Sequence, residues 1–212
     1  MQDYYNRRAK EYEEIYRRDE PLRQSELATL AADMQDTLFG LDVLEIACGT
    51  GYWTERLAGA ARTVVASDAS QEMLDIARSK HLPSKVNFVV ADAYDLGAVE
   101  GTFGGGLANF WFSHVPRARV TEFLEGCHQK LGTGAQVFMV DNCYMPGVGG
   151  ELVRPKGSSD TFKRRTLSDG TKHLILKNYY DADELSLIFA PLSRNLRVHV
   201  GTCYWWISYE VA

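Results

Sequence analysis

Long apolar stretches, paired cysteines and an excess of basic residues are all missing from this sequence of 212 residues. No apolar run approaches the roughly 18 residues that a membrane-spanning helix needs, so we expect no membrane partner. The first residues contain no apolar signal-peptide core. Lys and Arg number 23 against 28 Asp and Glu, a net charge of -5. Because nucleic-acid-binding proteins usually carry a basic excess, we expect no nucleic-acid partner either.

The cysteines give no metal or disulfide pattern. Cys48, Cys127, Cys143 and Cys203 are far apart, without a Cys-x-x-Cys pair or a histidine at zinc spacing. We therefore expect four reduced thiols, no metal site and a cytoplasmic protein. With 45% apolar and 24% charged residues, the composition is that of a globular protein, and the length predicts one domain over residues 1–212.

Strand patterns alternate with helix patterns in the first two thirds of the chain. We expect strands at 41–47, 63–68, 85–92, 106–112 and 135–141, and helices at 52–60, 71–80 and 116–131. Such alternation is typical of βαβ units. It predicts an α/β fold with a Rossmann-like, mostly parallel, twisted sheet and helices on both faces.

The two ends of the chain depart from this alternation. Amphipathic helices are expected at 3–18 and 22–38, a loop at 143–160, a β-hairpin formed by 161–167 and 171–178, a helix at 181–190, and strands at 196–200 and 204–211. We treat 143–180 as a loop and hairpin inserted over the sheet, because so few residues cannot enclose a core of their own. Residues 181–212 then complete the domain.

The hairpin is the most basic stretch of this acidic protein, and its register is open. A three-residue loop ending in Gly170 would place Arg165 opposite His173, and would put both on one face with Lys177. A two-residue turn would instead pair Arg165 with Leu174. The basic face is either solvated or binds an anion, to which the forked guanidinium of arginine is well suited.

A glycine loop follows the first expected strand. The stretch Glu45-Ile-Ala-Cys-Gly-Thr-Gly51 ends at the edge where α/β sheets bind ligands. Asp68 ends the second strand, where an acidic residue typically binds ribose hydroxyls, and Asp92 ends the third, where it suits an adenine amino group. Thr54 stands where a dinucleotide fingerprint has its third glycine, which opposes a nicotinamide oxidoreductase. A ligand with adenosine but no phosphate remains.

Together these motifs resemble the class I S-adenosylmethionine-dependent methyltransferases. The resemblance rests on Val43-Leu-Glu-Ile-Ala-Cys-Gly-Thr-Gly-Tyr-Trp-Thr54, on Asp68 and on Ala91-Asp92-Ala93, with Ala47 in place of a usual glycine. It implies S-adenosylmethionine as cofactor, S-adenosylhomocysteine as product, a lid at 1–38 and a cofactor-binding core at 39–142. The implied cofactor-binding residues are Tyr5, Tyr12, Ala47, Gly49, Gly51, Trp53, Asp68, Ala69, Met73, Asp92, Ala93 and Asn109. The alternative is that Asp68 and Asp92 only cap the helices that follow them.

Methyl transfer asks the protein mainly to align an acceptor and exclude water. His114 is a candidate base or hydrogen-bond donor, or else packs beneath the next helix. Tyr16 would close over the acceptor, or else pack onto the sheet. A base is needed only if the acceptor arrives protonated.

The hairpin carries a second resemblance. Arg164-Arg165-Thr-Leu-x-Asp-Gly with Lys177, and His114-Val-Pro, resemble a branch of bacterial natural-product methyltransferases that includes the phosphonate O-methyltransferase of dehydrophos biosynthesis. This implies that Arg165 and Lys177 bind an anionic group and that His114 is retained, whereas Phe110 replaces a second histidine of that enzyme. We therefore expect methyl transfer to the oxygen of a small anionic acceptor, a phosphonate- or carboxylate-like natural-product intermediate. The alternatives are N-methylation of a small heterocycle and a non-catalytic S-adenosylmethionine-binding module.

Overall fold

A computed structural model describes residues 9–167 and 170–212 of the protein. Its helices are η1 (Ala9–Tyr16), α2 (Pro21–Thr37), α3 (Tyr52–Leu57), α4 (Gln71–Ser79), η2 (Phe112–His114), η3 (Arg117–Arg119), α5 (Val120–Leu131), α6 (Ala182–Phe189) and η4 (Ala190–Leu192), the η elements being 3-10 helices. Its strands are β1 (Asp42–Ile46), β2 (Thr63–Asp68), β3 (Val86–Val90), β4 (Gly105–Asn109), β5 (Gln136–Asn142), β6 (Glu151–Val153), β7 (Phe162–Thr166), β8 (Lys172–Leu176), β9 (Ser193–Val200) and β10 (Tyr204–Val211).

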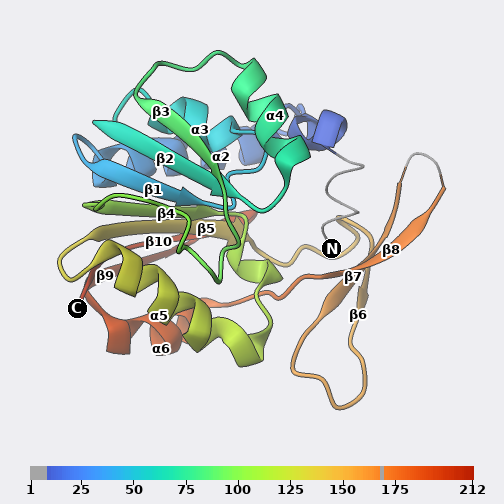
Figure 1. The fold of residues 1–212 in the computed structure, drawn as a ribbon. Helices are drawn as coiled ribbons and strands as arrows, with labels where there is room; N and C mark the ends of the chain where they lie inside the picture. Colours follow the sequence, from blue (N-terminus) through green and yellow to red (C-terminus); the bar gives the residue numbers. More distant parts are fainter. Residues whose placement is uncertain (1–8, 168–169) are drawn as a thin grey trace.

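A seven-stranded sheet in the order β3-β2-β1-β4-β5-β10-β9 forms the centre of the molecule. Strands β1 to β5 run parallel, and β10 pairs antiparallel with both β5 and β9. Helices α2, α3 and α4 cover one face, and α5 and α6 cover the other (Figure 1). An apolar cluster fills the space on each side, because both faces of a parallel sheet must be buried. The predicted Rossmann-like α/β fold is confirmed.

The topology places the ends of three strands together. Strand β1 lies between β2 and β4, at the point where the strand order reverses direction. Ile46, Asp68 and Asn109, the last residues of β1, β2 and β4, therefore reach the same edge of the sheet. A crevice at such a reversal is where open α/β sheets bind ligands.

The inserted hairpin belongs to a separate three-stranded sheet, β6-β7-β8, which projects from the main body (Figure 1). Arg165 pairs with His173, so the three-residue loop is the register that the chain adopts. Residues 168 and 169 of that loop lie outside the described part of the chain. The prediction of a plain loop at 143–160 is wrong for β6, which has only three residues and forms by pairing with β7. So short a strand carries no pattern of its own.

Two other predictions need correction. Helix α2 buries Leu27, Leu30 and Met34 against the sheet, so residues 21–37 form a core layer and not a lid. The fourth strand ends at Asn109 instead of residue 112, because Phe110 has φ 58° and turns the chain out of the sheet. Within the described part of the chain, no helix combines the length and apolar character that a membrane crossing requires.

Candidate functional site

A cavity of about 300 Å³ opens at the reversal point of the sheet. It is lined by Ala47, Gly49, Asp68, Ala69, Ser70, Met73, Ala91, Asp92, Ala93, Tyr94, Asn109, Phe110, Trp111, His114 and Arg119. We call it the first cavity. The set contains most of the predicted cofactor-binding residues, from the loops that follow β1, β2, β3 and β4. The topology thus brings together residues that the sequence separates widely.

The glycine loop approaches this cavity through unusual backbone conformations. Gly49 has φ 57°, and a Cβ built on it would meet no atom within 4 Å, so its backbone faces open space. Ala47 has φ 55°, in the left-handed region that glycine adopts at less cost. Strain at a non-glycine residue costs on the order of 1 kcal/mol, and such residues cluster at ligand sites.

Asp68 fastens the glycine loop to the end of β2. Its Oδ2 accepts from the Gly49 amide at 2.8 Å and its Oδ1 accepts from the Ser70 amide at 2.9 Å. Burial raises the pKa of Asp68, while these backbone donors act in the opposite direction. Each carboxylate oxygen still has a lone pair for a further donor. Asp68 therefore does cap the next segment, and it also presents acceptors to the cavity. Asp92, by contrast, is exposed, and its Oδ1 accepts from the Tyr94 amide at 2.9 Å.

Three buried polar atoms in the lining of the first cavity have no hydrogen-bond partner among the described residues. They are Asn109 Oδ1, Tyr94 Oη and Trp111 Nε1. A buried polar atom without a hydrogen-bond partner destabilises the fold by about 1–3 kcal/mol, so such atoms are rare and often mark a binding site. A polar ligand carrying amino and hydroxyl groups, as S-adenosylmethionine does, would satisfy them. The residues present fit that cofactor.

Several predicted cofactor residues lie elsewhere. Gly51 and Trp53 are outside the lining of the first cavity. A Cβ on Gly51 would approach Ala77 Cβ to 3.0 Å, so this glycine permits close packing of the loop on α4. Trp53 is buried in the core. Tyr5 and the side chain of Tyr12 lie outside the described part of the structure.

A smaller cavity of about 110 Å³ lies on the other side of Phe110. It is lined by Ile15, Tyr16, Arg18, Arg23, Phe110, Asn142, Cys143, Met145, Val148, Gly149, Arg165, Tyr179, Cys203 and Tyr204. We call it the second cavity. Its lining contains three arginines and no carboxylate, whereas that of the first cavity contains two carboxylates, Asp68 and Asp92, and one arginine, Arg119.

The two cavities share Phe110 alone among their lining residues. Its ring contacts those of Tyr16, Trp53 and Tyr204, at centroid distances of 5.7, 5.9 and 5.5 Å. The left-handed backbone of Phe110 is strained for an aromatic residue. This strained residue therefore forms the wall between an acidic and a basic cavity.

His114 is held as a neutral imidazole. Its Nδ1 lies 2.7 Å from the carbonyl oxygen of Leu176, which can only accept, so the proton is on Nδ1. Burial lowers the pKa of His114 to about 3, and the nearby Lys177 ammonium acts in the same direction. His114 lines the first cavity and not the second. So low a pKa makes the ring a weak base, and at neutral pH it can still form hydrogen bonds.

The charge of Lys177, which we predicted to bind an anion, is paired within the protein. Its ammonium donates to Asp141 Oδ1 and to Ser113 Oγ, both at 2.7 Å, in a fully buried cluster. Burial alone would raise the pKa of Asp141, but Lys177 holds it below its usual value. Lys177 lines neither cavity. It joins the segment after β8 to β5 and η2, and thereby positions His114.

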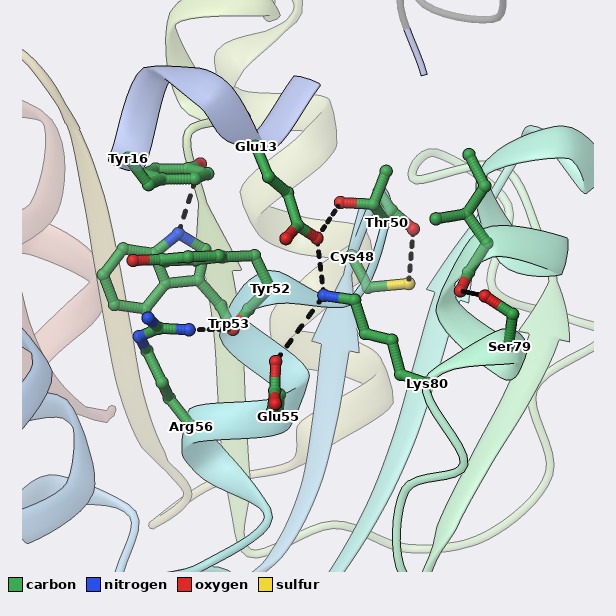
Figure 2. A network of polar contacts seen from close by, with 12 residues as sticks. Glu13, Tyr16, Cys48, Thr50, Tyr52, Trp53, Glu55, Arg56, Ser79 and Lys80 are labelled. Atoms are coloured by element: carbon green, nitrogen blue, oxygen red, sulfur yellow. Dashed lines mark hydrogen bonds and ion pairs between the residues drawn. The ribbon is translucent and has the colours of Figure 1, made fainter. Parts of the chain in front are cut away.

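A network of polar contacts attaches η1 to the glycine loop (Figure 2). Glu13 accepts from Thr50 Oγ1 at 2.8 Å and forms an ion pair with Lys80. The ring of Tyr16 stacks on Tyr52 with centroids 3.9 Å apart, and Trp53 Nε1 donates to Tyr16 Oη at 3.3 Å (Figure 2). These contacts hold the segment against the glycine loop, and its Ile15 and Tyr16 line the second cavity.

Sequence reasoning missed several lining residues. In the first cavity these are Ser70, Ala91, Tyr94, Trp111 and Arg119, and in the second Arg18, Arg23, Tyr179 and Tyr204 are prominent. Tyr94 directly follows the Ala91-Asp92-Ala93 motif, which could have indicated it, whereas Trp111 falls inside the strand expected at 106–112. No sequence signal marks Arg23, which reads as one more charge on an amphipathic helix.

Comparison with known proteins agrees with this geometry. A family model described as a methyltransferase domain matches residues 43–134. The DhpI–SAH complex superposes with a TM-score of 0.78 at 27% identity, covering 99% of this chain and 94% of that one. The DhpI–SAM–HEP complex superposes with a TM-score of 0.77 at 28% identity, covering 98% of this chain and 94% of that one. The matches thus include solved structures of complexes with SAH and with SAM.

Curated relatives include the ubiquinone biosynthesis O-methyltransferase of Dinoroseobacter shibae. It is 30% identical over 166 residues, which cover 73% of this chain and 66% of that protein. Three other curated relatives match over only 23%, 34% and 38% of their own length. The family model, at residues 43–134, spans all the residues that line the first cavity.

Proposed function

Because the chain belongs to the S-adenosylmethionine-dependent methyltransferases and uses that cofactor as methyl donor, we propose that it methylates an oxygen of a small anionic acceptor. One observation carries the proposal: an acidic cavity and an arginine-lined cavity share the Phe110 wall. Cofactor in the first and acceptor in the second would meet at that wall. The resemblance of the hairpin and His114 motifs to a phosphonate O-methyltransferase supports a phosphonate-like acceptor from natural-product metabolism. The similar solved structures include a DhpI–SAM–HEP complex.

In this proposal the first cavity holds the cofactor through groups at the strand ends. Asp68 accepts from the ribose hydroxyls, and the backbone at 47–49 lies against the methionine part. Asn109 Oδ1, an acceptor without a partner among the described residues, receives the ammonium group. When bound, the cofactor supplies a methyl group already activated as a sulfonium, so the protein has only to align the acceptor and exclude water.

The second cavity holds the acceptor through Arg165. None of the described carboxylates lies within ion-pair distance of its guanidinium, so that charge is available to an anion. Tyr16 closes the cavity from η1, and its ring also contacts Phe110. An acceptor oxygen that is already ionised needs no base, which is consistent with a neutral His114. The four free cysteines also support a reducing, cytoplasmic location.

Turnover by charge variants tests the proposal. Wild-type protein is offered S-adenosylmethionine with a panel of small phosphonates, carboxylates and amines, and products are identified by mass. With the best acceptor, Arg165→Met should raise KM about thirtyfold, the effect of losing one charge-assisted contact of about 2 kcal/mol. The neighbouring Arg164 is exposed and pairs with Glu151, so Arg164→Met is the matched control. His114→Ala should cost far less than Arg165→Met.

The opposite ranking would contradict the proposal. A dominant His114 with a silent Arg165 would indicate a protonated hydroxyl or nitrogen acceptor. Binding of cofactor without turnover of any acceptor would favour a non-catalytic binding module.

A further inference from the structure

Arg23 is a buried cation of the second cavity that sequence reasoning did not single out. It lies in the first turn of α2, and its side chain is only 9% exposed. A charge so far removed from water is stable only when other groups satisfy it. Its partners are therefore informative.

Arg23 is partly but not fully satisfied. Its Nε donates to Glu20 at 2.8 Å, its Nη1 to Tyr204 Oη at 3.0 Å and its Nη2 to the sulfur of Met145 at 3.9 Å. A guanidinium has five N–H donors, so two remain without a partner among the described residues. The sulfur is moreover a weak acceptor. These donors belong to a side chain that lines the second cavity.

Tyr204 adds a further donor to the same place. Its hydroxyl oxygen accepts from Arg23, and its own O–H has no acceptor among the described residues. Glu20, the carboxylate that balances Arg23, is half exposed and does not line the cavity. The cavity thus presents guanidinium and hydroxyl donors, while the counter-charge faces solvent.

We propose that Arg23, positioned by Glu20 and Tyr204, is a second anion-binding residue of the acceptor cavity and acts together with Arg165. This inference rests on the proposed function. The two arginines come from different elements, α2 and β7, and line one cavity. An acceptor group with three anionic oxygens can meet both arginines and still present one oxygen to the methyl group. A carboxylate has only two oxygens, so it meets both arginines less well.

Anion binding to the intact protein saturated with S-adenosylhomocysteine tests this role. Methylphosphonate is titrated calorimetrically, with inorganic phosphate and acetate as further probes and acetamide as the neutral one. We expect methylphosphonate to bind more tightly than acetate, and Arg23→Met to weaken it at least about tenfold. Arg23→Lys keeps a charge but loses the planar fork, and should weaken it at least about threefold. Affinity for S-adenosylhomocysteine should stay within about twofold in both variants.

Arg62→Met is the matched control, since Arg62 pairs with Asp42 at the start of β1, at the opposite end of the strand from both cavities. It should bind methylphosphonate as the wild type does. If Arg23→Met does not fold, Arg23→Lys decides the question. Wild-type affinity in the folded Arg23 variants, with loss in Arg165→Met, would overturn the role of Arg23 alone. Failure of the wild-type protein to bind any of the anions would overturn the proposed function as well.

Discussion

Individual side chains at this site are held by contacts within the protein, and these contacts bear on any role in binding. Asp68 holds the glycine loop through the Gly49 amide and also lines the first cavity. Lys177 carries a charge of the sign expected for anion binding, yet that charge is used inside the protein by Asp141. The residue type alone therefore does not assign a role; the partners within hydrogen-bond distance do.

Replacing Asp68 should separate cofactor binding from folding. Asp68→Ala removes an ionised acceptor, and hydrogen bonds to charged groups are worth about 1.5–3 kcal/mol. We expect affinity for S-adenosylmethionine, measured by calorimetry, to fall at least about tenfold. Asp75→Ala is the control, because Asp75 is an exposed carboxylate on α4 that pairs with Arg78. Unchanged affinity in Asp68→Ala would remove this residue from the binding site.

The buried His114 should make stability depend on pH. Its folded-state pKa of about 3 lies below its ordinary value of 6.5, so between these values the unfolded chain binds a proton that the folded protein does not. The contribution of His114 to the free energy of unfolding is therefore fully present above pH 6.5 and is lost as the pH falls toward 3. The free energy of unfolding changes by up to about 1.4 kcal/mol per pH unit through this group.

Urea unfolding between pH 4 and pH 7 measures the effect. His114→Gln should show a smaller rise in the free energy of unfolding with pH than the wild type. The comparison of the two proteins is needed because other buried groups titrate as well. Burial raises the pKa of Glu45 to about 8, for example, so its contribution falls as the pH rises. Equal slopes in both proteins would mean that His114 ionises normally.

At the scale of elements, the second cavity is built where separate segments meet. Segment η1 contributes Tyr16, α2 contributes Arg23, β7 contributes Arg165 and β10 contributes Tyr204. Segment η1 is joined to the glycine loop and the helices beside it by polar and aromatic contacts (Figure 2). Such contacts open at lower cost than a buried apolar helix face, so η1 is the element suited to admit ligands.

Breaking the Glu13 contacts should loosen this element. Glu13→Gln removes the charge that binds Lys80, in a pair whose side chains are 19% and 17% exposed. We expect faster amide hydrogen exchange in residues 9–16. Cofactor binding should weaken about threefold, which corresponds to the free energy that a partly exposed ion pair contributes. Glu14 is exposed on the same segment, so Glu14→Gln is the control. Exchange that is equally slow in both variants and unaffected by cofactor would show that η1 is not a lid.

At the scale of the whole molecule, the net charge is -5, but the lining of one cavity has the opposite sign. Three arginines line one cavity of an acidic protein, and the cavity beside it contains aspartates. Such an arrangement favours an anionic ligand in one of the two cavities only. The charge of the surface as a whole therefore gives no guide to the charge of the substrate.

This local field should make acceptor binding depend on salt. Raising KCl from 0.05 to 0.5 M shortens the screening length from more than 10 Å to less than about 5 Å. We expect KM for an anionic acceptor to rise severalfold, while affinity for S-adenosylmethionine changes less. Sucrose at equal osmolality serves as the control. A KM that is insensitive to salt would argue against an anionic acceptor.

The sequence by itself determined the layered fold and the cofactor edge, because both depend on local patterns. Apolar runs that alternate with amphipathic helices require a parallel sheet covered on both faces. A glycine loop or an aspartate that follows a strand, such as Asp68, must then lie at the carboxyl edge of that sheet. Tertiary structure alone decided the lining of the second cavity. Strand β6, the neutralised Lys177 and the buried Arg23 depend on residues far apart in the chain, such as Arg23 and Tyr204. Local sequence patterns carry no information about such pairings, since the contacts exist only once the chain has folded.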